Sequence, residues 1–233
     1  MSEAYSMFRK NVLSVILLIF FLSSCAGTGL LSNAQNQFER GLELYNRSQY
    51  EEAITHFKKS SELDPAFEKA YIYLGRSYLN LWRWSEAVSP LRTALKLSPE
   101  ESKGEIVNML TEALLGAAAT ALIEGNYQES VNFIREALKL DPHSRKIFNE
   151  LLKTLIAQGE ELLSRGKTNE AIQSFNETIQ LSADMVEAYL GLAKAFFQKG
   201  DLSKALFAAE KALQIDPSNK NADLLFNQLK QNE

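Results

Sequence analysis

Few side chains in this chain are of a type that does covalent chemistry. Cys25 is the only thiol in 233 residues, and His56 and His143 are the only histidines. No HExxH, GxSxG or glycine-rich phosphate loop is present to build a metal, nucleophile or phosphate site. Acidic pairs such as Glu51-Glu52 fall at expected helix starts, where carboxylates are favourable and solvated. The sequence therefore predicts no enzyme activity and no metal site.

Cys25 follows a segment with the layout of a secretory signal peptide. Arg9 and Lys10 precede the apolar run VLSVILLIFFL at residues 12–22, about half the roughly 20 residues of a spanning helix. The ending Leu22-Ser23-Ser24-Cys25 resembles the lipobox of bacterial lipoproteins, in which the cysteine is lipidated and begins the mature chain. The resemblance implies a covalent lipid on Cys25 and no other cofactor. An uncleaved signal anchor and the first helix of a globular core are the alternative interpretations of the run.

The same resemblance implies a membrane-anchored protein of the bacterial cell envelope. Ala26 follows the cysteine, where an aspartate would resemble an inner-membrane retention signal, so the periplasmic side of the outer membrane is favoured. With no second cysteine there is no internal disulfide, and the domain must be stabilised by its core. The formal charge of −4 argues against non-specific nucleic-acid binding. Met7 is an alternative start to Met1.

The rest of the chain is repetitive. Related blocks end in proline or alanine: YEEAITHFKKSSELDP, WSEAVSPLRTALKLSP, YQESVNFIREALKLDP, TNEAIQSFNETIQLSA and LSKALFAAEKALQIDP. In one register the units begin at Ala34, Glu68, Thr111, Leu152 and Val186. Small residues recur at the eighth position, namely Gly41, Gly75, Ala118, Gly159 and Ala193, and at the twentieth, namely Ala53, Ala87, Ser130, Ala171 and Ala205.

These positions resemble the tetratricopeptide repeat family. The resemblance implies an all-α fold, a right-handed α-solenoid of about five helix-turn-helix repeats with a C-terminal capping helix. Each unit is two antiparallel helices, A and B, and the small residues lie where the helices cross. Added bulk at such a crossing typically costs about 1–3 kcal/mol. No unit buries its apolar face alone, so the stack is the fold.

The expected organisation follows this register. Residues 1–24 are a lipoprotein signal peptide, 25–33 the lipidated cysteine and tether, 34–101 repeat units 1–2, 102–219 units 3–5 with extended A helices, and 220–233 the capping helix. The extensions are two inserts, residues 102–110 and 145–151, each close to two helical turns. An extra helical pair within residues 102–151, or two sub-stacks of units 1–2 and 3–5, are alternatives.

Protein partners are expected in the concave groove lined by the A helices. The groove positions implied by the family register are Phe38, Leu42, Tyr45, Lys69, Ile72, Arg76, Leu79, Asn80, Leu115 and Leu122. Only Lys69, Arg76 and Asn80 resemble the family's carboxylate clamp, so a chaperone-tail ligand is not expected. The apolar remainder favours a partner helix or an extended apolar segment. The alternative is that several of these side chains are packed by the extended helices or the tether.

Trp82 is a second candidate contact, because an indole replaces the usual small residue of an inter-helix turn. The alternative is that it folds back on Tyr45 or Trp84. The predicted function is an envelope scaffold or adaptor that binds protein partners. Lipoproteins of this kind resemble pilus-secretin pilotins, cell-wall-enzyme adaptors and outer-membrane assembly accessories, and the sequence does not choose among them. A glycan- or lipid-binding lipoprotein is the alternative, and the oligomeric state is left open.

Overall fold

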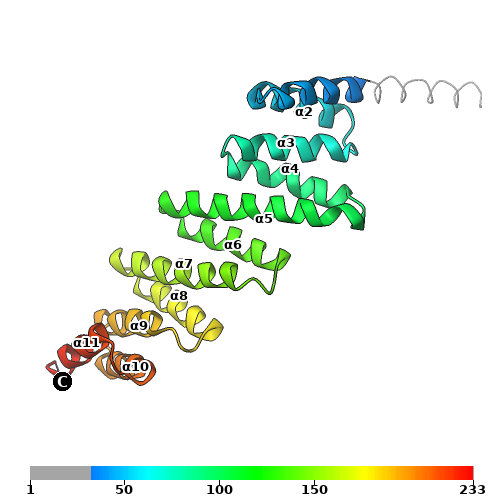
Figure 1. The fold of residues 1–233 in the computed structure, drawn as a ribbon. Helices are drawn as coiled ribbons and strands as arrows, with labels where there is room; N and C mark the ends of the chain where they lie inside the picture. Colours follow the sequence, from blue (N-terminus) through cyan, green and yellow to red (C-terminus); the bar gives the residue numbers. More distant parts are fainter. Residues whose placement is uncertain (1–32, 233) are drawn as a thin grey trace, which may run out of the picture. The chain divides into compact units, whose positions relative to one another are not determined.

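The computed structural model describes residues 33–232, which contain eleven helices and no strand (Figure 1). The first helix covers residues 33–46. The labelled helices that follow are α2 (Tyr50–Leu63), α3 (Glu68–Asn80), α4 (Trp84–Leu97), α5 (Glu100–Ile123), α6 (Tyr127–Leu140), α7 (Arg145–Ser164), α8 (Thr168–Leu181), α9 (Val186–Gln198), α10 (Leu202–Ile215) and α11 (Lys220–Lys230). The prediction of an all-α fold built from helix-turn-helix repeats is confirmed. The lipidation prediction for Cys25 and the signal-peptide prediction for residues 1–24 lie outside the described residues.

The chain divides into two compact units, and the boundary falls inside α5, between Ala113 and Leu114. The first unit contains α2, α3 and α4, and the second contains α6 to α11. Both inserts are helical and continuous with the A helices that they precede. As a result α5 has 24 residues and α7 has 20, whereas α3 and α9 have 13 each.

Each A helix ends in a tight turn before its B helix. In the third repeat the amide of Asn126 donates to Ala121 O (2.7 Å) and that of Gly125 to Leu122 O (3.1 Å). This pattern of two crossed bonds closes a helix through one residue in the left-handed conformation, usually glycine. Glycine holds that position in the last three repeats, with φ of 77° at Gly125, 73° at Gly166 and 82° at Gly200.

The second repeat makes the same turn with Trp82 at φ 60°. The amide of Trp82 donates to Leu79 O (3.0 Å) and that of Arg83 to Tyr78 O (3.0 Å), so the hydrogen bonds match those of the glycine turns. A non-glycine residue in this conformation is strained by roughly 1–2 kcal/mol. The sequence therefore keeps a bulky indole where glycine would fit better.

An aromatic cluster forms the core of the first unit. The ring of Phe38 lies 5.7 Å from that of Phe57, 5.0 Å from Phe67 and 5.5 Å from Tyr73. Phe38 is only 6% exposed and Phe57 is fully buried. The prediction that Phe38 lines a free groove is therefore wrong, because its ring is used to pack the first two repeats together.

Glycine at the eighth position lets the two helices of a repeat approach closely. A Cβ added at Gly41 would lie 2.7 Å from the ring of Phe57, and one at Gly159 would lie 2.6 Å from that of Phe175. Phe175 also meets Gly191 of the following repeat, where an added Cβ would lie 2.3 Å from the ring. The small eighth residue thus makes room for a large side chain of helix B.

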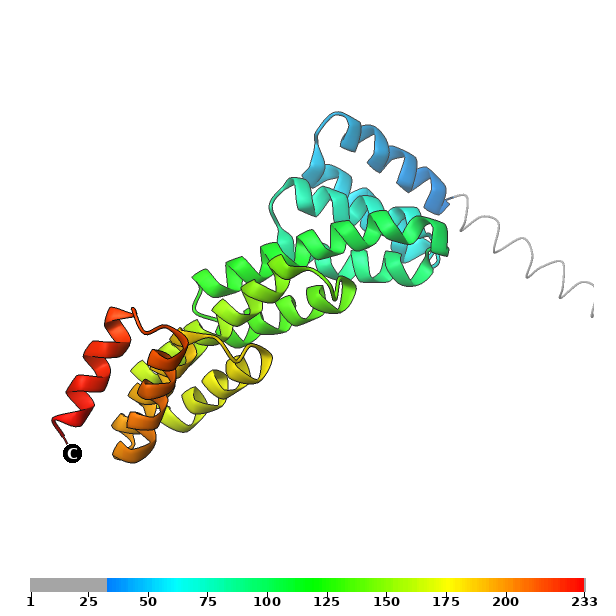
Figure 2. The ribbon, with the colours of Figure 1, turned by 60° about the horizontal axis from the view of Figure 1, so that its bottom comes forward.

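Helix α11 packs on α9 and α10 at the end of the second unit (Figure 2). Leu229 is 1% exposed and belongs to the core cluster around Phe175, while Ala222 packs near Val186. Leu224, on the other face of the helix, stays exposed. Helix α11 therefore covers apolar surface of the last repeat with one face only.

Among residues 33–232, α5 is the helix long and apolar enough to cross a membrane by length and composition alone. Several of its apolar residues are buried by neighbouring helices, including Ile106, Leu110, Leu114 and Ala117 at no more than 1% exposure. Burial inside the repeats accounts for part of its composition, since 39% of this apolar window is buried.

Candidate protein-binding groove

In the first unit the predicted groove residues other than Phe38 remain at least partly accessible. Lys69 and Asn80 are exposed, and the half-buried ones are Leu42, Tyr45, Ile72, Arg76 and Leu79. Asn80 donates to the Tyr45 hydroxyl (3.2 Å) and to Arg76 O (2.8 Å). The Asn80 amide thus links the Tyr45 hydroxyl to the α3 backbone, and Tyr45 and Asn80 form one polar patch between the first two A helices.

Arg76 is neutralised by a residue that the register did not include. Its guanidinium forms an ion pair with Glu105 and lies 5.1 Å from the ring centroid of Tyr73. Glu105 belongs to the insert at residues 102–110, which the family register does not assign to the groove. The ion pair with Glu105 thus occupies one of the two cations of the clamp-like set, and Lys69 is the other.

In the second unit Leu115 and Leu122 lie together in an apolar cavity of about 300 Å³. Helix α5 also contributes Ala119 and Ile123, and Ile123 is 88% exposed. The opposite walls are Ile134 of α6 and the first turns of α7. The predicted groove residues of the third repeat are therefore brought together around one concave site.

The α7 wall of this cavity consists of residues that the register left out. Lys146, Ile147 and Glu150 belong to the insert at residues 145–151 and line the cavity with Thr154. Ile147 is 2% exposed, whereas Lys146 and Glu150 are exposed. The insert thus adds an apolar contact and two charges to the groove.

Ser130 of α6 also lines the apolar cavity and is fully buried. Among the described residues, its hydroxyl is the buried side-chain polar atom that lacks a hydrogen-bond partner. The sequence signal for this site is the twentieth position of the register, which holds Ser130 here and alanine in the other four repeats.

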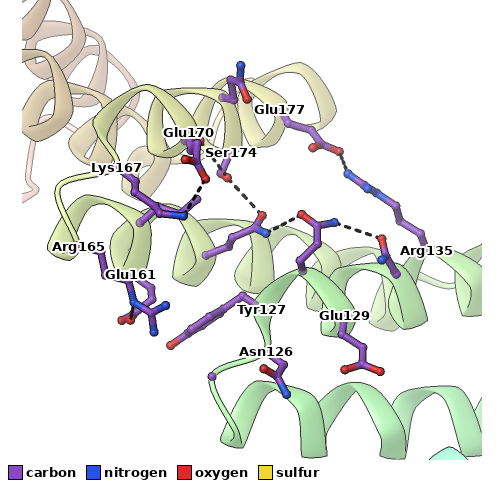
Figure 3. A pocket seen from close by; sticks show the side chains of 16 residues that line it. Asn126, Tyr127, Glu129, Arg135, Glu161, Arg165, Lys167, Glu170, Ser174 and Glu177 are labelled. Atoms are coloured by element: carbon purple, nitrogen blue, oxygen red, sulfur yellow. Dashed lines mark hydrogen bonds and ion pairs between the residues drawn. The ribbon is translucent and has the colours of Figure 1, made fainter.

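A larger polar pocket of about 820 Å³ lies over α6, α7 and α8 in the second unit (Figure 3). A ladder of hydrogen bonds crosses it: Ser174 donates to Gln158 (3.2 Å), Gln158 to Gln128 (3.0 Å) and Gln128 to Asn132 (3.2 Å). The repeat register does not predict this ladder, because two of its hydrogen bonds join residues 16 and 30 positions apart.

Ion pairs frame this polar pocket, and Tyr127 lies among its lining residues (Figure 3). Arg135 pairs with Glu177 across two helices, and Arg165 pairs with Glu161 at 2.6 Å on the same helix. These charges are largely paired within the protein. The groups that the pocket presents to a ligand are therefore mainly carboxamides and one aromatic ring.

Trp82 stands on the turn between α3 and α4, 75% exposed, with its ring 5.4 Å from Trp84 in an edge contact. It does not fold away into the core, although it touches Trp84 as one alternative expected. Next to it, Arg83 donates to both carboxylate oxygens of Glu51 at 2.9 Å and pairs with Glu86. The hydrogen bond from Arg83 holds the pKa of Glu86 below its usual range.

No group of histidine, cysteine or carboxylate side chains within residues 33–232 is placed to hold a metal ion. His56 is half-buried and hydrogen-bonded to Gln37 at 2.8 Å, and His143 is exposed on the turn after α6. The two histidines thus lie at separate places, His56 on α2 and His143 on the turn after α6.

Comparison with known proteins identifies the repeat. Two tetratricopeptide repeat models match residues 156–220 and 111–144. A model described as regulator of microtubule dynamics protein 1-3 matches residues 42–119. Residues 111–144 and 156–220 therefore match tetratricopeptide repeats, as the register predicted for the third to fifth repeats.

Relatives in other organisms match this chain over part of their own length. Human protein O-mannosyl-transferase TMTC1 is 28% identical over 183 residues, which are 77% of this chain and 19% of that protein. Hsp70-Hsp90 organizing protein 1 of Glycine max is 23% identical over 77% of this chain and 35% of its own length. The chain thus spans about a fifth to a third of these relatives.

A solved structure supports the fold along most of the chain. The crystal structure of a TPR repeats protein from Bacteroides fragilis superposes with a TM-score of 0.58 at 14% identity, covering 86% of this chain and 99% of that one. At this identity the similarity concerns the fold alone.

Proposed function

We propose that this protein is a membrane-anchored interaction scaffold of the bacterial cell envelope, which binds a helix or peptide of a partner protein in the groove of its repeats. Tetratricopeptide repeats are stacks whose extended surfaces serve protein binding. The observation that carries the proposal is the apolar cavity at Leu115 and Leu122, where the predicted groove is hollowed. Its apolar walls suit the apolar face of an amphipathic helix.

The anchor in this proposal is a lipid on Cys25, at the periplasmic face of the outer membrane. Multi-chain lipidation anchors stably, whereas a single acyl chain binds only marginally. The test is metabolic labelling with an alkyne fatty acid, comparing the wild type with Cys25→Ala. Labelling of the wild type alone, with the variant unprocessed or soluble, is expected. Normal processing and detergent-dependent fractionation of the variant would contradict the anchor.

Partner binding is tested by photo-crosslinking in cells. A crosslinking amino acid at position 123, on the exposed edge of the apolar cavity, is compared with one at position 176, an exposed site on α8. A discrete product from 123 and none from 176 is expected, and mass spectrometry of it would identify the partner. Equal products from both positions, or none from either, would refute groove binding.

The identity of the partner decides the pathway. Pilus or secretin assembly and outer-membrane assembly require one partner helix, whereas an adaptor for cell-wall enzymes would engage several proteins that compete for the groove. The number of different proteins found in the crosslinked products distinguishes these cases: one for a single partner helix, several for an adaptor. Trp82 is proposed as a second contact, because its exposed indole is held in a strained turn.

Glycan binding is the second candidate function, and the polar pocket of Figure 3 is the observation that favours it. Carboxamides and an aromatic ring are the groups expected of a site for polar, uncharged ligands. Soluble peptidoglycan fragments added to the full chain would shift the NMR signals of Gln128 and Gln158 if this function holds. Unchanged signals at both residues would exclude it.

A further inference from the structure

The apolar cavity of the second unit is large enough for an aromatic side chain. Its volume is about 300 Å³, roughly twice that of an engineered apolar cavity of about 150 Å³ that holds benzene. Leu115, Leu122 and Ile147 supply aliphatic walls from two A helices. A single leucine or valine would leave much of this space empty, and empty space forfeits contacts.

The repeats themselves explain why the cavity exists. Position 24 holds Phe57 in the first repeat and Phe175 in the fourth, each pressed against the glycine at position eight. In the third repeat the same two positions are Ile134 and Ala118, and both line the cavity. A ring that the protein supplies from its own chain in two other repeats is therefore missing here.

Ser130 gives the cavity a polar feature. Its hydroxyl is buried without a hydrogen-bond partner, although alanine suffices for packing at this position in the other four repeats. A buried hydroxyl left unpaired destabilises the fold, so each such group calls for an explanation. A ligand with a polar atom on an otherwise apolar ring would satisfy it.

Two opposite charges border the cavity. Lys146 and Glu150 lie one turn apart at the start of α7, and neither forms an ion pair within residues 33–232. A partner segment that carries an acidic and a basic residue beside its aromatic anchor would complement both. A purely apolar occupant such as an acyl chain would complement neither charge.

We infer that this cavity binds a tryptophan or tyrosine side chain of a partner segment, with the ring against Leu115 and Leu122 and its N–H or O–H on Ser130 Oγ. Both side chains combine a large apolar body with one polar atom that is usually hydrogen-bonded when buried. Phenylalanine fills the space but leaves Ser130 unpaired. The inference rests on the proposed scaffold function and specifies the chemistry of its ligand.

The test uses N-acetyltryptophanamide as the probe, titrated into the full chain in lipid nanodiscs and followed by the methyl NMR signals of Leu115 and Leu122. The controls are its N1-methyl derivative, which lacks the N–H, and N-acetylphenylalaninamide. Loss of one hydrogen bond is expected to weaken binding about threefold to tenfold for either control. Equal affinity of all three probes, or tighter binding of decanoate, would overturn the inference.

Three protein variants complete the test. In Ser130→Ala, which has the alanine of the other repeats, the difference between the tryptophan probe and its N1-methyl derivative should disappear. In Ala118→Gly/Ile134→Phe, which restores the glycine and phenylalanine of the first and fourth repeats, binding should fall at least tenfold. If the double variant folds poorly, Ala119→Glu replaces it in the test. Ala119 is an exposed residue on the rim of the cavity, and the same loss of binding is expected. A methylation penalty that persists in Ser130→Ala would refute the role of the hydroxyl.

The outcome is separable from that of the scaffold proposal. Crosslinking from position 123 together with no binding of the tryptophan probe would overturn the aromatic pocket and leave groove binding standing. Probe binding that depends on Ser130, without any crosslinked protein, would support the pocket chemistry and overturn the scaffold function.

Discussion

Substitution of Gly75 by alanine tests whether helix crossings set the stability of the repeats. An added Cβ would lie 2.5 Å from both Cγ and Cδ2 of Leu91, and 3.3 Å from Cδ1. Carbon atoms normally approach to about 3.5–4.0 Å, so the overlap is at least roughly 1 Å. Leu91 is fully buried, so its side chain is enclosed by neighbouring atoms. Overpacking of this kind costs about 1–3 kcal/mol.

Gly104 supplies the matched control, because it is also a helical glycine but an added Cβ meets nothing within 4 Å. Alanine stabilises an exposed helical site by about 0.5–1 kcal/mol relative to glycine. The same propensity gain applies at Gly75. The difference between the two variants therefore isolates the overlap, and we expect Gly75→Ala to be less stable than Gly104→Ala by about 1–3 kcal/mol.

The measurement is urea unfolding of the full chain, monitored by circular dichroism. The free energies of unfolding of the two variants and the wild type are compared with one shared m value, the slope of free energy against urea concentration. Adding Leu91→Ala provides a double-mutant cycle: in that background Gly75→Ala should become stabilising, since the overlapping atoms are gone. If Gly75→Ala and Gly104→Ala raise the midpoint equally, the close approach of the two helices is not real.

Three further predictions concern single side chains. Asp201 caps α10 through the amide of Lys204 (3.1 Å), and hydrogen bonds from the Lys204 side chain and then its backbone lower the Asp201 pKa. Asp201→Ala should lower Tm at neutral pH, and the deficit should shrink below pH about 4, since the stabilisation is lost as pH falls through the lowered pKa; a deficit independent of pH would contradict the cap. Trp82→Gly should stabilise the fold by about 0.5–1 kcal/mol by relieving the strained turn, measured by urea unfolding, and a loss of stability would mean that the contact with Trp84 outweighs the strain. Gln158→Ala should destabilise by about 1 kcal/mol because two hydrogen bonds of the polar ladder are lost, whereas Gln173→Ala in the same pocket should stay within about 0.5 kcal/mol; equal effects would rule out the ladder.

The repeat architecture was readable from the sequence because each signal is local and recurs. Gly41, Gly75 and Gly159 fall at one position of the register, and each meets a large residue of its own helix B in the structure. A fixed spacing of small residues and turn glycines thus determines the pairing of helices. The close contact between Gly191 and Phe175 joins two different repeats, so no single-repeat pattern reveals it.

The groove was predicted less well, because burial depends on what packs above each position. Phe38 and Leu122 both lie on the groove face in the register, yet Phe38 is buried by rings from three other residues, whereas Leu122 lines an open cavity. The identity of position 24 decides the difference in the second unit. Phe175 fills the space in the fourth repeat and Ile134 leaves it open in the third.

The two inserts act on the groove through different chemistry in the two units. In the first unit Glu105 pairs with Arg76 and removes a cation that a carboxylate ligand would need. In the second unit Lys146 and Glu150 add charges beside an apolar cavity whose own repeat supplies none. To lengthen a helix, an insert needs only residues of good helix propensity, and its charged side chains could all point into solvent. Their positions at groove-lining sites instead support the proposal that the inserts control ligand selectivity, away from carboxylate tails and toward an aromatic side chain flanked by both signs of charge.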